Sequence, residues 1–470
     1  MLHLLAPGKA APTLMLRKNE AGLCCFSHGV RHLPCRGRGS GSAGAPAPAL
    51  VLERTLPLSG VKLEDLQKAD NARLKKHVVE YSLGGMPGLY YTRVKLGTPS
   101  KEYILQFDTG SDIPWVSCTP CKGCPTSSED NIKLKSYNPN SSSTSSRISC
   151  SDDRCTDAIE TGYAVCNTSE PPSSQCGYIQ TYADGSATLG CSKLRSDNMQ
   201  TDGIIGFGQN AVPAISQLNS QGLSPKVFSH CLKGSEDGGG ILVLGEVVKP
   251  GIVFTPLIPS QPHYNVNLKR IAVNGKNISI NSSFFTTSNA QGTIVDSGTS
   301  LTYLADGVYD PVLREIVDAI PLNSSDFGGR QCYFSSLSKV SLFPTVTLNF
   351  EGGASMTVEP KNYLLLIDHY ENYDVLCIGL QPSKGIKNFQ NTTILGDIVL
   401  RDKIFVYNLE KMSIGWVNCN CSLLNTSTTL VVSESSGRRA PLFYSSCTAI
   451  GVVLINVLRR CKFPHRRLVQ

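Results

Sequence analysis

The chain has 470 residues, of which 41% are hydrophobic and 17% are charged. This length predicts two or three units that each bury a core, and the composition is that of a globular protein and excludes a fully disordered chain. Much of the net charge of +7 lies near the two ends, and the middle has no dense basic stripe with interleaved aromatics, which excludes a nucleic-acid partner.

Residues 1–50 predict a disordered leader whose role the sequence does not define. The stretch from Met1 to Leu5 is mainly apolar, but Pro7 and Lys9 interrupt the apolar run, and residues 22–50 are rich in Gly, Ala, Pro and Arg. A secretory signal needs an unbroken apolar run after a basic start, so this segment is not typical of one.

Residues 51–83 change character. Leu63, Leu66, Ala69 and Leu74 recur at roughly helical spacing among several lysines and arginines. Two interpretations stay open: a solvated basic helix, or a prosegment-like element whose positive charges cover an anionic cleft.

From Tyr90 onwards the pattern predicts a mostly β protein. Short β-type runs alternate with turn residues, and Gly307–Ile320 is the best helical stretch. The clearest β runs are YYTRVKL, YILQF, GIVFTPL, YNVNLKRIAV, TVTLNF and KIFVYNL. We assign residues 84–250 to an N-terminal lobe and residues 251–421 to a C-terminal lobe.

The 18 cysteines support two interpretations. Cys118, Cys121 and Cys124 have zinc-like spacing, but no second cysteine pair or histidine follows at finger distance. Disulfides are favoured, because N-x-S/T sequons also indicate a secretory route. These sequons are Asn140, Asn167, Asn277, Asn281, Asn323, Asn391, Asn420 and Asn425. We therefore expect a disulfide-bonded glycoprotein that is extracellular, in the cell wall, attached to a membrane or in the vacuole.

Residues 422–470 form a predicted tail. Its segment 440–458 is uncharged and moderately apolar, and a basic run follows from Arg459. A helix of this length can just cross a bilayer, which needs about 20 residues, and the basic flank would then be cytosolic. A membrane anchor, a degraded lipid-anchor signal and a disordered tail remain alternatives.

An internal repeat is the most informative feature of the sequence. The segment Gln106–Asp112 reads QFDTGSD, and Ile294–Ser300 reads IVDSGTS. Each copy is followed, 98 and 100 positions after its first aspartate, by the glycine of an Ile-Ile-Gly or Ile-Leu-Gly segment. Two matched copies predict two lobes related by a pseudo-twofold axis, each of which supplies one carboxylate.

Asp108 and Asp296 are the candidate catalytic residues. Two carboxylates that face each other share one proton, and the handling of that proton suits general acid–base catalysis on a water molecule. No metal and no cofactor is required. Glycines in these motifs allow a tight turn, and the hydroxyl residues can hold the carboxylates. The supporting residues are Thr109, Gly110, Ser111, Ser297, Gly298 and Thr299.

These motifs resemble those of the pepsin-like aspartic proteases, in particular the plant-type, nepenthesin-like branch. The resemblance covers about residues 84–420 and implies a bilobal β fold with a cleft between the lobes, a polypeptide substrate and a monomer. Tyr182-Ala-Asp-Gly185 is similar to the tip of that family's flap, so Tyr182 and Gly185 are expected to bind substrate. Cys332 and Cys377 resemble its second-lobe disulfide, and residues 51–83 resemble the end of a prosegment.

The chain departs from the family pattern at residues 191–201. These eleven residues leave room for about one strand and have little β character, so the first lobe is expected to lack strands that would line substrate subsites. Two functions therefore stay open: an aspartic endopeptidase active at acidic pH, or a non-catalytic binding or inhibitor protein on the same scaffold.

Overall fold

A computed structural model gives the fold of the chain. It describes residues 15–16, 49–54 and 89–424, apart from short gaps. The gaps are 122–123, 129–132, 161, 168, 170, 182–186, 190–192, 196–199, 235–237, 289–290, 327–329, 371–372 and 387–388. The predicted helix near residues 62–76 and the predicted membrane segment 440–458 lie outside the described residues.

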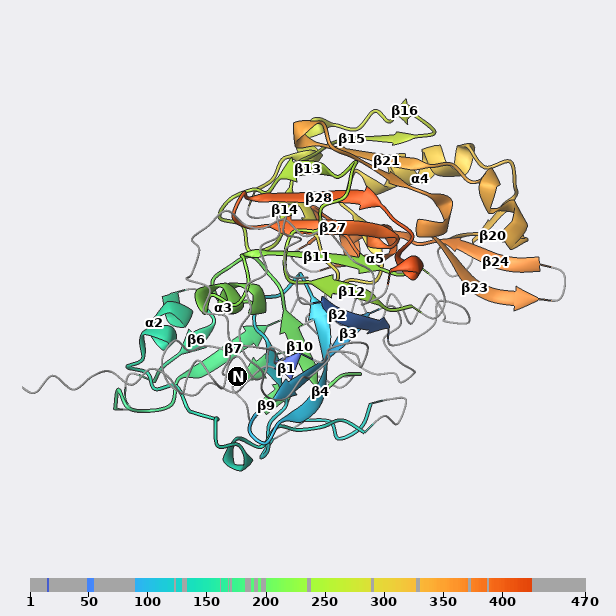
Figure 1. Cartoon of the computed structure of the whole chain (residues 1–470). Coiled ribbons are helices and arrows are strands. Elements are labelled where there is room, and N and C mark those ends of the chain that lie inside the picture. Colours follow the sequence, from blue (N-terminus) through green and yellow to red (C-terminus); the bar gives the residue numbers. More distant parts are fainter. Residues whose placement is uncertain are drawn as a thin grey trace, which may run out of the picture.

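The described chain is mostly β and forms two lobes on either side of a shared set of strands (Figure 1). The largest sheet runs in the order β13-β28-β27-β11-β12-β2-β3-β4-β10-β5, and β1 pairs with β3. Its strands are β1 (Met15–Leu16), β2 (Ala49–Arg54), β3 (Tyr90–Leu96), β4 (Lys101–Asp108), β5 (Trp115–Val116), β10 (Gly203–Gly206), β11 (Val227–Leu232), β12 (Gly240–Val243), β13 (Val253–Pro256), β27 (Lys403–Asn408) and β28 (Ser413–Asn418). Strands from both halves of the sequence thus meet in one sheet.

Most of the β runs predicted from the sequence are confirmed as strands. The run YYTRVKL is β3, where buried and partly exposed residues alternate along the strand, as a sheet with one buried face requires. The boundary expected at residues 50–51 falls inside β2, which pairs with β12 on one side and with β3 on the other. The burial of alternate residues continues across that boundary, so residues 49 and 50 share one strand with residues 51–54.

The described residues of the second lobe add three sheets. They run in the orders β14-β17-β26-β18-β25, β16-β15-β21-β22 and β19-β20-β24-β23. Their strands are β14 (Asn265–Val266), β15 (Leu268–Val273), β16 (Lys276–Asn277), β17 (Gly292–Val295), β18 (Thr302–Leu304), β19 (Ser324–Asp326), β20 (Gln331–Ser335), β21 (Val346–Phe350), β22 (Ser355–Val358), β23 (Leu364–Tyr370), β24 (Tyr373–Ile378), β25 (Leu380–Pro382) and β26 (Thr392–Leu395).

Helices are short and few among the described residues. The predicted helix is confirmed as α4, which buries Val312 and Ile316 on one face. The others are α2 (Asp153–Glu160), α3 (Ala214–Ser220) and α5 (Asp397–Leu400), and α4 itself spans Tyr309–Asp318. The short 3-10 helices are η1 (Pro139–Ser141), η3 (Ser282–Phe285), η4 (Leu337–Leu342), η5 (Glu351–Gly353), η6 (Pro360–Asn362), η7 (Ser383–Gly385) and η8 (Cys421–Leu423). No helix within the described part of the chain is long and apolar enough to span a membrane.

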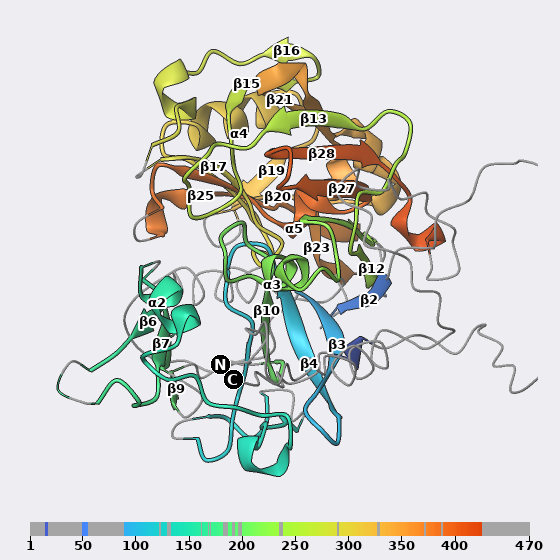
Figure 2. The same cartoon turned by 60° about the vertical axis from the view of Figure 1, so that its left-hand side comes forward.

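A small four-stranded sheet belongs to the first lobe, and its labelled strands β6, β7 and β9 stand apart from β3 and β4 in Figure 2. It contains β6 (Ala164–Val165), β7 (Gly177–Thr181), β8 (Ala187–Leu189) and β9 (Lys193–Arg195) in that order. The described part of residues 191–201 contains one short strand, β9, which is about what the length of the segment has room for. Contrary to the expected lack of β character, β9 forms and pairs with β8.

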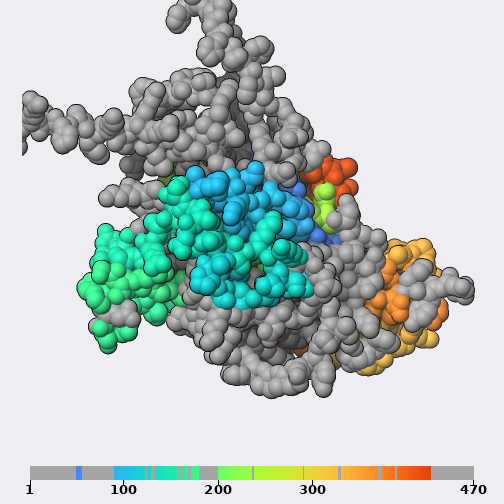
Figure 3. All heavy atoms as spheres, turned by 90° about the horizontal axis from the view of Figure 1, so that it is seen from below, coloured from blue at the N-terminus to red at the C-terminus, as the bar shows by residue number. Residues whose placement is uncertain are grey.

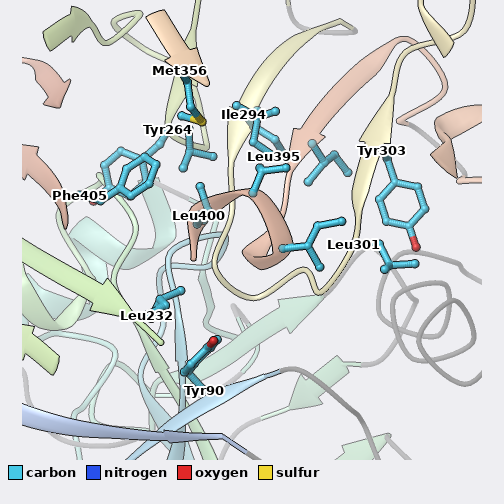
Figure 4. Packing of buried hydrophobic residues seen from close by; sticks show 14 of the residues in the cluster. Tyr90, Leu232, Tyr264, Ile294, Leu301, Tyr303, Met356, Leu395, Leu400 and Phe405 are labelled. Atoms are coloured by element: carbon cyan, nitrogen blue, oxygen red, sulfur yellow. The ribbon is translucent and has the colours of Figure 1, made fainter. Parts of the chain in front are cut away.

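One continuous hydrophobic core runs through both lobes. Ile294 and Leu395 stand beside Leu400 in its second-lobe part, and Leu232 lies towards the first lobe (Figure 4). Viewed from below, first-lobe residues in blue and green gather on one face, while the orange residues lie at its edge (Figure 3). This core holds the strands that carry the two repeated motifs in a fixed relation.

Candidate active site

Asp108 is the last residue of β4 and starts a tight loop. The strand runs parallel to β10, with Gly206 opposite Asp108. The Gly110 N–H donates to Asp108 Oδ1 at 2.8 Å, and Ser111 Oγ donates to Oδ2 at 2.6 Å. The side chain is fully buried, so these donors fix its carboxylate.

Asp296 has the same surroundings in the second lobe. It follows β17, which runs parallel to β26 as β4 does to β10. The Gly298 N–H donates to Asp296 Oδ1 at 2.8 Å, and Thr299 Oγ1 donates to Oδ2 at 2.6 Å. The repeat found in the sequence therefore corresponds to a repeated local geometry.

The two loops face each other and exchange hydrogen bonds. The Ser297 N–H donates to Thr109 Oγ1 at 2.9 Å, and the Thr109 N–H donates to Ser297 Oγ at 3.2 Å. These two hydroxyls were expected to hold the carboxylates. Each instead accepts a hydrogen bond from the facing loop, because the backbone N–H of that loop is buried and needs an acceptor.

Gly110 shows how close the two carboxyl groups are. Its N–H binds Asp108, while a Cβ placed on it would lie 2.6 Å from Asp296 Oδ2. The residue must therefore be glycine, because any side chain would displace the Asp296 carboxylate. Both aspartates flank this one residue, so the structure brings the predicted pair together.

Two residues that the sequence did not indicate brace the loops. Tyr264 is fully buried and donates its hydroxyl to the Phe207 carbonyl at 2.7 Å. His263 Nδ1 lies 3.1 Å from the Gly110 carbonyl oxygen. These second-lobe residues thus contact first-lobe backbone beside the site. The only sequence signal for Tyr264 was its place at the start of a predicted β run, and His263 lies just before that run.

A buried ion pair beyond Asp296 was also missed. Asp397 follows Gly396 directly, and its Oδ1 accepts from Arg401 Nη2 at 2.7 Å with both side chains almost fully buried. Burial raises the pKa of Asp397, and the negative charge of Asp296 acts in the same direction, whereas Arg401 lowers it. Arg54 of β2 also lowers the pKa of Asp397 through its positive charge.

The flap residues Tyr182 and Gly185 lie outside the described residues. Cys332 and Cys377 form a disulfide with an S–S distance of 2.02 Å between β20 and β24, as the resemblance implied. Cys121 pairs with Cys124, and Cys118 is disulfide-bonded as well, so these three sulfurs are not free to hold zinc. Cys150, Cys155 and Cys166 lie close together, but they too are in disulfides.

Known proteins are similar to this chain in sequence and in fold. The family profile described as eukaryotic aspartyl protease matches residues 89–419. Aspartic proteinase 36 of Arabidopsis thaliana is 35% identical over 80% of this chain and 83% of its own length.

Aspartic proteinase nepenthesin-2 of Nepenthes gracilis is 30% identical over 71% of this chain and 78% of its own length. The crystal structure titled edgp, at 18% identity, aligns with a TM-score of 0.54 over 81% of this chain and 97% of that chain, and supports the fold alone. By its sequence match, this chain belongs to the eukaryotic aspartyl protease family.

Proposed function

We propose that the chain is an aspartic endopeptidase that hydrolyses peptide bonds of polypeptides at acidic pH through Asp108 and Asp296. The reciprocal hydrogen bonds between Thr109 and Ser297 are the observation that carries this proposal. They hold the two aspartate loops face to face, which an unrelated pair of Asp-Gly turns would not require.

The residues suggest how the reaction would run. One carboxylate is ionised and takes a proton from the attacking water, while the other is protonated and donates a hydrogen bond to the substrate carbonyl. Like charges this close cannot both ionise cheaply, so the pair works with one shared proton. Ser111 and Thr299 keep each carboxylate in place during that exchange.

We further propose that the chain works in an oxidising, secretory compartment. Disulfides link distant parts of the described chain, for example Cys231 of β11 to Cys421 near its end. Such bonds persist in secreted proteins and are rare in the cytosol. Glycosylation at the sequons, a monomeric state and membrane attachment through residues 440–458 remain predictions.

The test is hydrolysis of an acid-denatured protein at low pH by the purified full chain. Asp108→Asn and Asp296→Asn should each abolish cleavage, and a statine-type peptide, which mimics the tetrahedral transition state, should block the unmutated protein. Asp306→Asn serves as a matched control, because Asp306 is an exposed aspartate in the turn before α4. Cleavage that survives Asp108→Asn would refute the mechanism.

The same experiment separates the second function that the sequence left open. A folded wild-type chain that binds the statine peptide but never cleaves the substrate would favour a non-catalytic binding protein. Substrate cleavage that disappears with either active-site substitution would exclude that alternative.

A further inference from the structure

Asp112 is a second buried carboxylate in the first-lobe loop, four residues after Asp108, and the proposed chemistry does not use it. Its side chain is almost fully buried. Its Oδ2 accepts a very short hydrogen bond from the Tyr163 hydroxyl and another from Asn210 Nδ2 at 2.6 Å. Its Oδ1 has no hydrogen-bond partner among the described residues.

The two donors come from separate parts of the first lobe. Asn210 follows β10, and its own carbonyl accepts from Ser216 Oγ at 2.6 Å near the start of α3. Tyr163 lies between α2 and β6, in a segment that two disulfides close, Cys150–Cys166 and Cys155–Cys176. We call residues 150–176 the cysteine-linked segment. Asp112 therefore joins the aspartate loop to both α3 and this segment.

Asp112 is connected to Asp108 through one residue, Ser111. Ser111, directly before Asp112, donates its hydroxyl to Asp108 Oδ2 at 2.6 Å, and its carbonyl accepts from the Gly208 N–H at 3.0 Å. A Cβ on Gly206 would come within 2.8 Å of the same carbonyl, so the loop has little free space on that side. Any movement of Asp112 would consequently move the hydroxyl that holds Asp108.

The electrostatic environment of Asp112 favours a role for its hydrogen bonds over a role for its negative charge. Burial raises the pKa of Asp112, while the bonds from Asn210 and Tyr163 and the nearby His263 lower it. A protonated carboxyl group keeps a carbonyl oxygen that still accepts from both donors.

We propose that Asp112 is a positioning residue, whose hydrogen bonds to Tyr163 and Asn210 anchor the Asp108 loop to the cysteine-linked segment. This inference rests on the proposed endopeptidase function. It gives the cysteine-linked segment a task in the reaction, namely to keep the Asp108 carboxylate aimed at the facing aspartate.

The experiment measures kcat and KM of the full chain on a short fluorogenic peptide at acidic pH. Asp112→Ala should lower kcat by about 10- to 100-fold with KM within about twofold of wild type, because misplaced catalytic groups slow the chemical step. Asp112→Asn should restore kcat to within about threefold, since its amide oxygen accepts from the same two donors.

Two further variants keep the test decisive if Asp112→Ala folds poorly. Tyr163→Phe removes one donor and should lower kcat by about 3- to 10-fold through the same loss of positioning. Tyr91→Phe is its matched control, because Tyr91 is a partly buried tyrosine whose hydroxyl donates to Glu53, away from the aspartates. It should leave kcat unchanged. Active-site titration with the statine peptide corrects every kcat for the folded fraction.

Each result bears on a defined claim. Wild-type kcat in both Asp112→Ala and Tyr163→Phe would overturn the positioning role while leaving the endopeptidase function intact. An Asp112→Asn variant as slow as Asp112→Ala would overturn the hydrogen-bond explanation. An inactive wild-type chain would instead refute the proposed function, and this inference with it.

Discussion

The two aspartate loops share their hydrogen bonds but rest on different buried supports. In each loop a glycine N–H donates at 2.8 Å and a hydroxyl donates at 2.6 Å to the aspartate. In the second lobe a buried carboxylate, Asp397, is paired with the cation Arg401. In the first lobe the extra carboxylate, Asp112, accepts hydrogen bonds from two neutral donors, Tyr163 and Asn210.

The two extra carboxylates do not occupy equivalent positions in the repeat. The residue at the offset of Asp112 in the second lobe is Ser300, and the residue at the offset of Asp397 in the first lobe is Phe207. The two lobes thus share the motif that holds the aspartate, but each has a different buried polar group near it. The comparison predicts a large penalty for breaking the charged support and a smaller one for breaking neutral hydrogen bonds.

Removal of the cation should have the largest effect. Arg401→Met leaves Asp397 buried without its partner beside Asp296, which should lower the free energy of unfolding by about 3–5 kcal/mol at pH 7. This loss of stability depends on the ionisation of Asp397. Burial raises the folded-state pKa of Asp397, so the loss should be absent below the unfolded-state pKa of 3.8 and should grow as the pH rises above that value. Urea unfolding at pH 3 and pH 7 measures both quantities.

Two controls make that result specific to burial. Lys276→Met breaks an exposed pair with Glu315, at 2.9 Å, and should change stability by about 0–1 kcal/mol. Asp397→Asn combined with Arg401→Met should recover part of the lost stability, because no unpaired charge then stays buried. An Arg401→Met variant within about 1 kcal/mol of wild type at pH 7 would contradict the distinction between the two supports.

A buried neutral histidine in the largest sheet, His230, should make stability depend on pH in the opposite direction. His230 of β11 is fully buried, 3.1 Å from the Tyr407 hydroxyl, and burial lowers its pKa to about 3. The folded state then binds fewer protons than the unfolded state between its unfolded value of 6.5 and about 3, so stability falls as the pH falls through that range. From pH 7 to pH 4 the loss should be about 3 kcal/mol.

His230→Phe tests this value. The ring still packs against Phe405, whose ring centroid lies 5.4 Å from that of His230, and it cannot titrate. We expect the variant to be less stable by about 1 kcal/mol at pH 7, because it loses one hydrogen bond, and more stable than wild type at pH 4. Thermal unfolding across this range measures the crossover. Parallel stability curves for the two proteins would show that His230 does not set the acid response.

The shared part of the site could be predicted from the sequence, and the divergent part could not. Asp108, Asp296 and their neighbouring glycines and hydroxyls lie within two copies of one short motif, so local comparison found them. Asp112 lies in the same motif, but its donor Tyr163 comes from a cysteine-rich loop 51 positions later. Nothing local to either residue indicates that pairing.

Contacts between residues far apart in the sequence also explain where the observed fold differs from the predicted one. Strands with a clear alternation, such as β3, were predicted closely because period-2 burial is a local signal. The place of β2 between β12 and β3 depends on partners up to about 190 residues away, and no pattern within Ala49–Arg54 specifies them. The role of Thr109 and Ser297 was misassigned for this reason too, since each bonds a loop from the other lobe.

The reciprocal hydrogen bonds between Thr109 and Ser297 compare the two lobes most directly. Thr109→Val and Ser297→Ala each leave one buried backbone N–H without its acceptor, which should lower the free energy of unfolding by about 1–3 kcal/mol. If the lobes were equivalent here, the two losses would match. Thr109 also hydrogen-bonds Tyr407, so its substitution should cost about 1 kcal/mol more.

Urea unfolding of both single variants and of the double variant measures these terms. Because the two bonds hold the same pair of loops, the double variant should lose less stability than the sum of the single losses. Tyr407→Phe removes the extra bond and should make the two substitutions equal in its background. Equal losses in the Tyr407→Phe background would place the asymmetry between the lobes in the Tyr407 hydrogen bond and the buried supports, because the aspartate loops themselves would then be interchangeable.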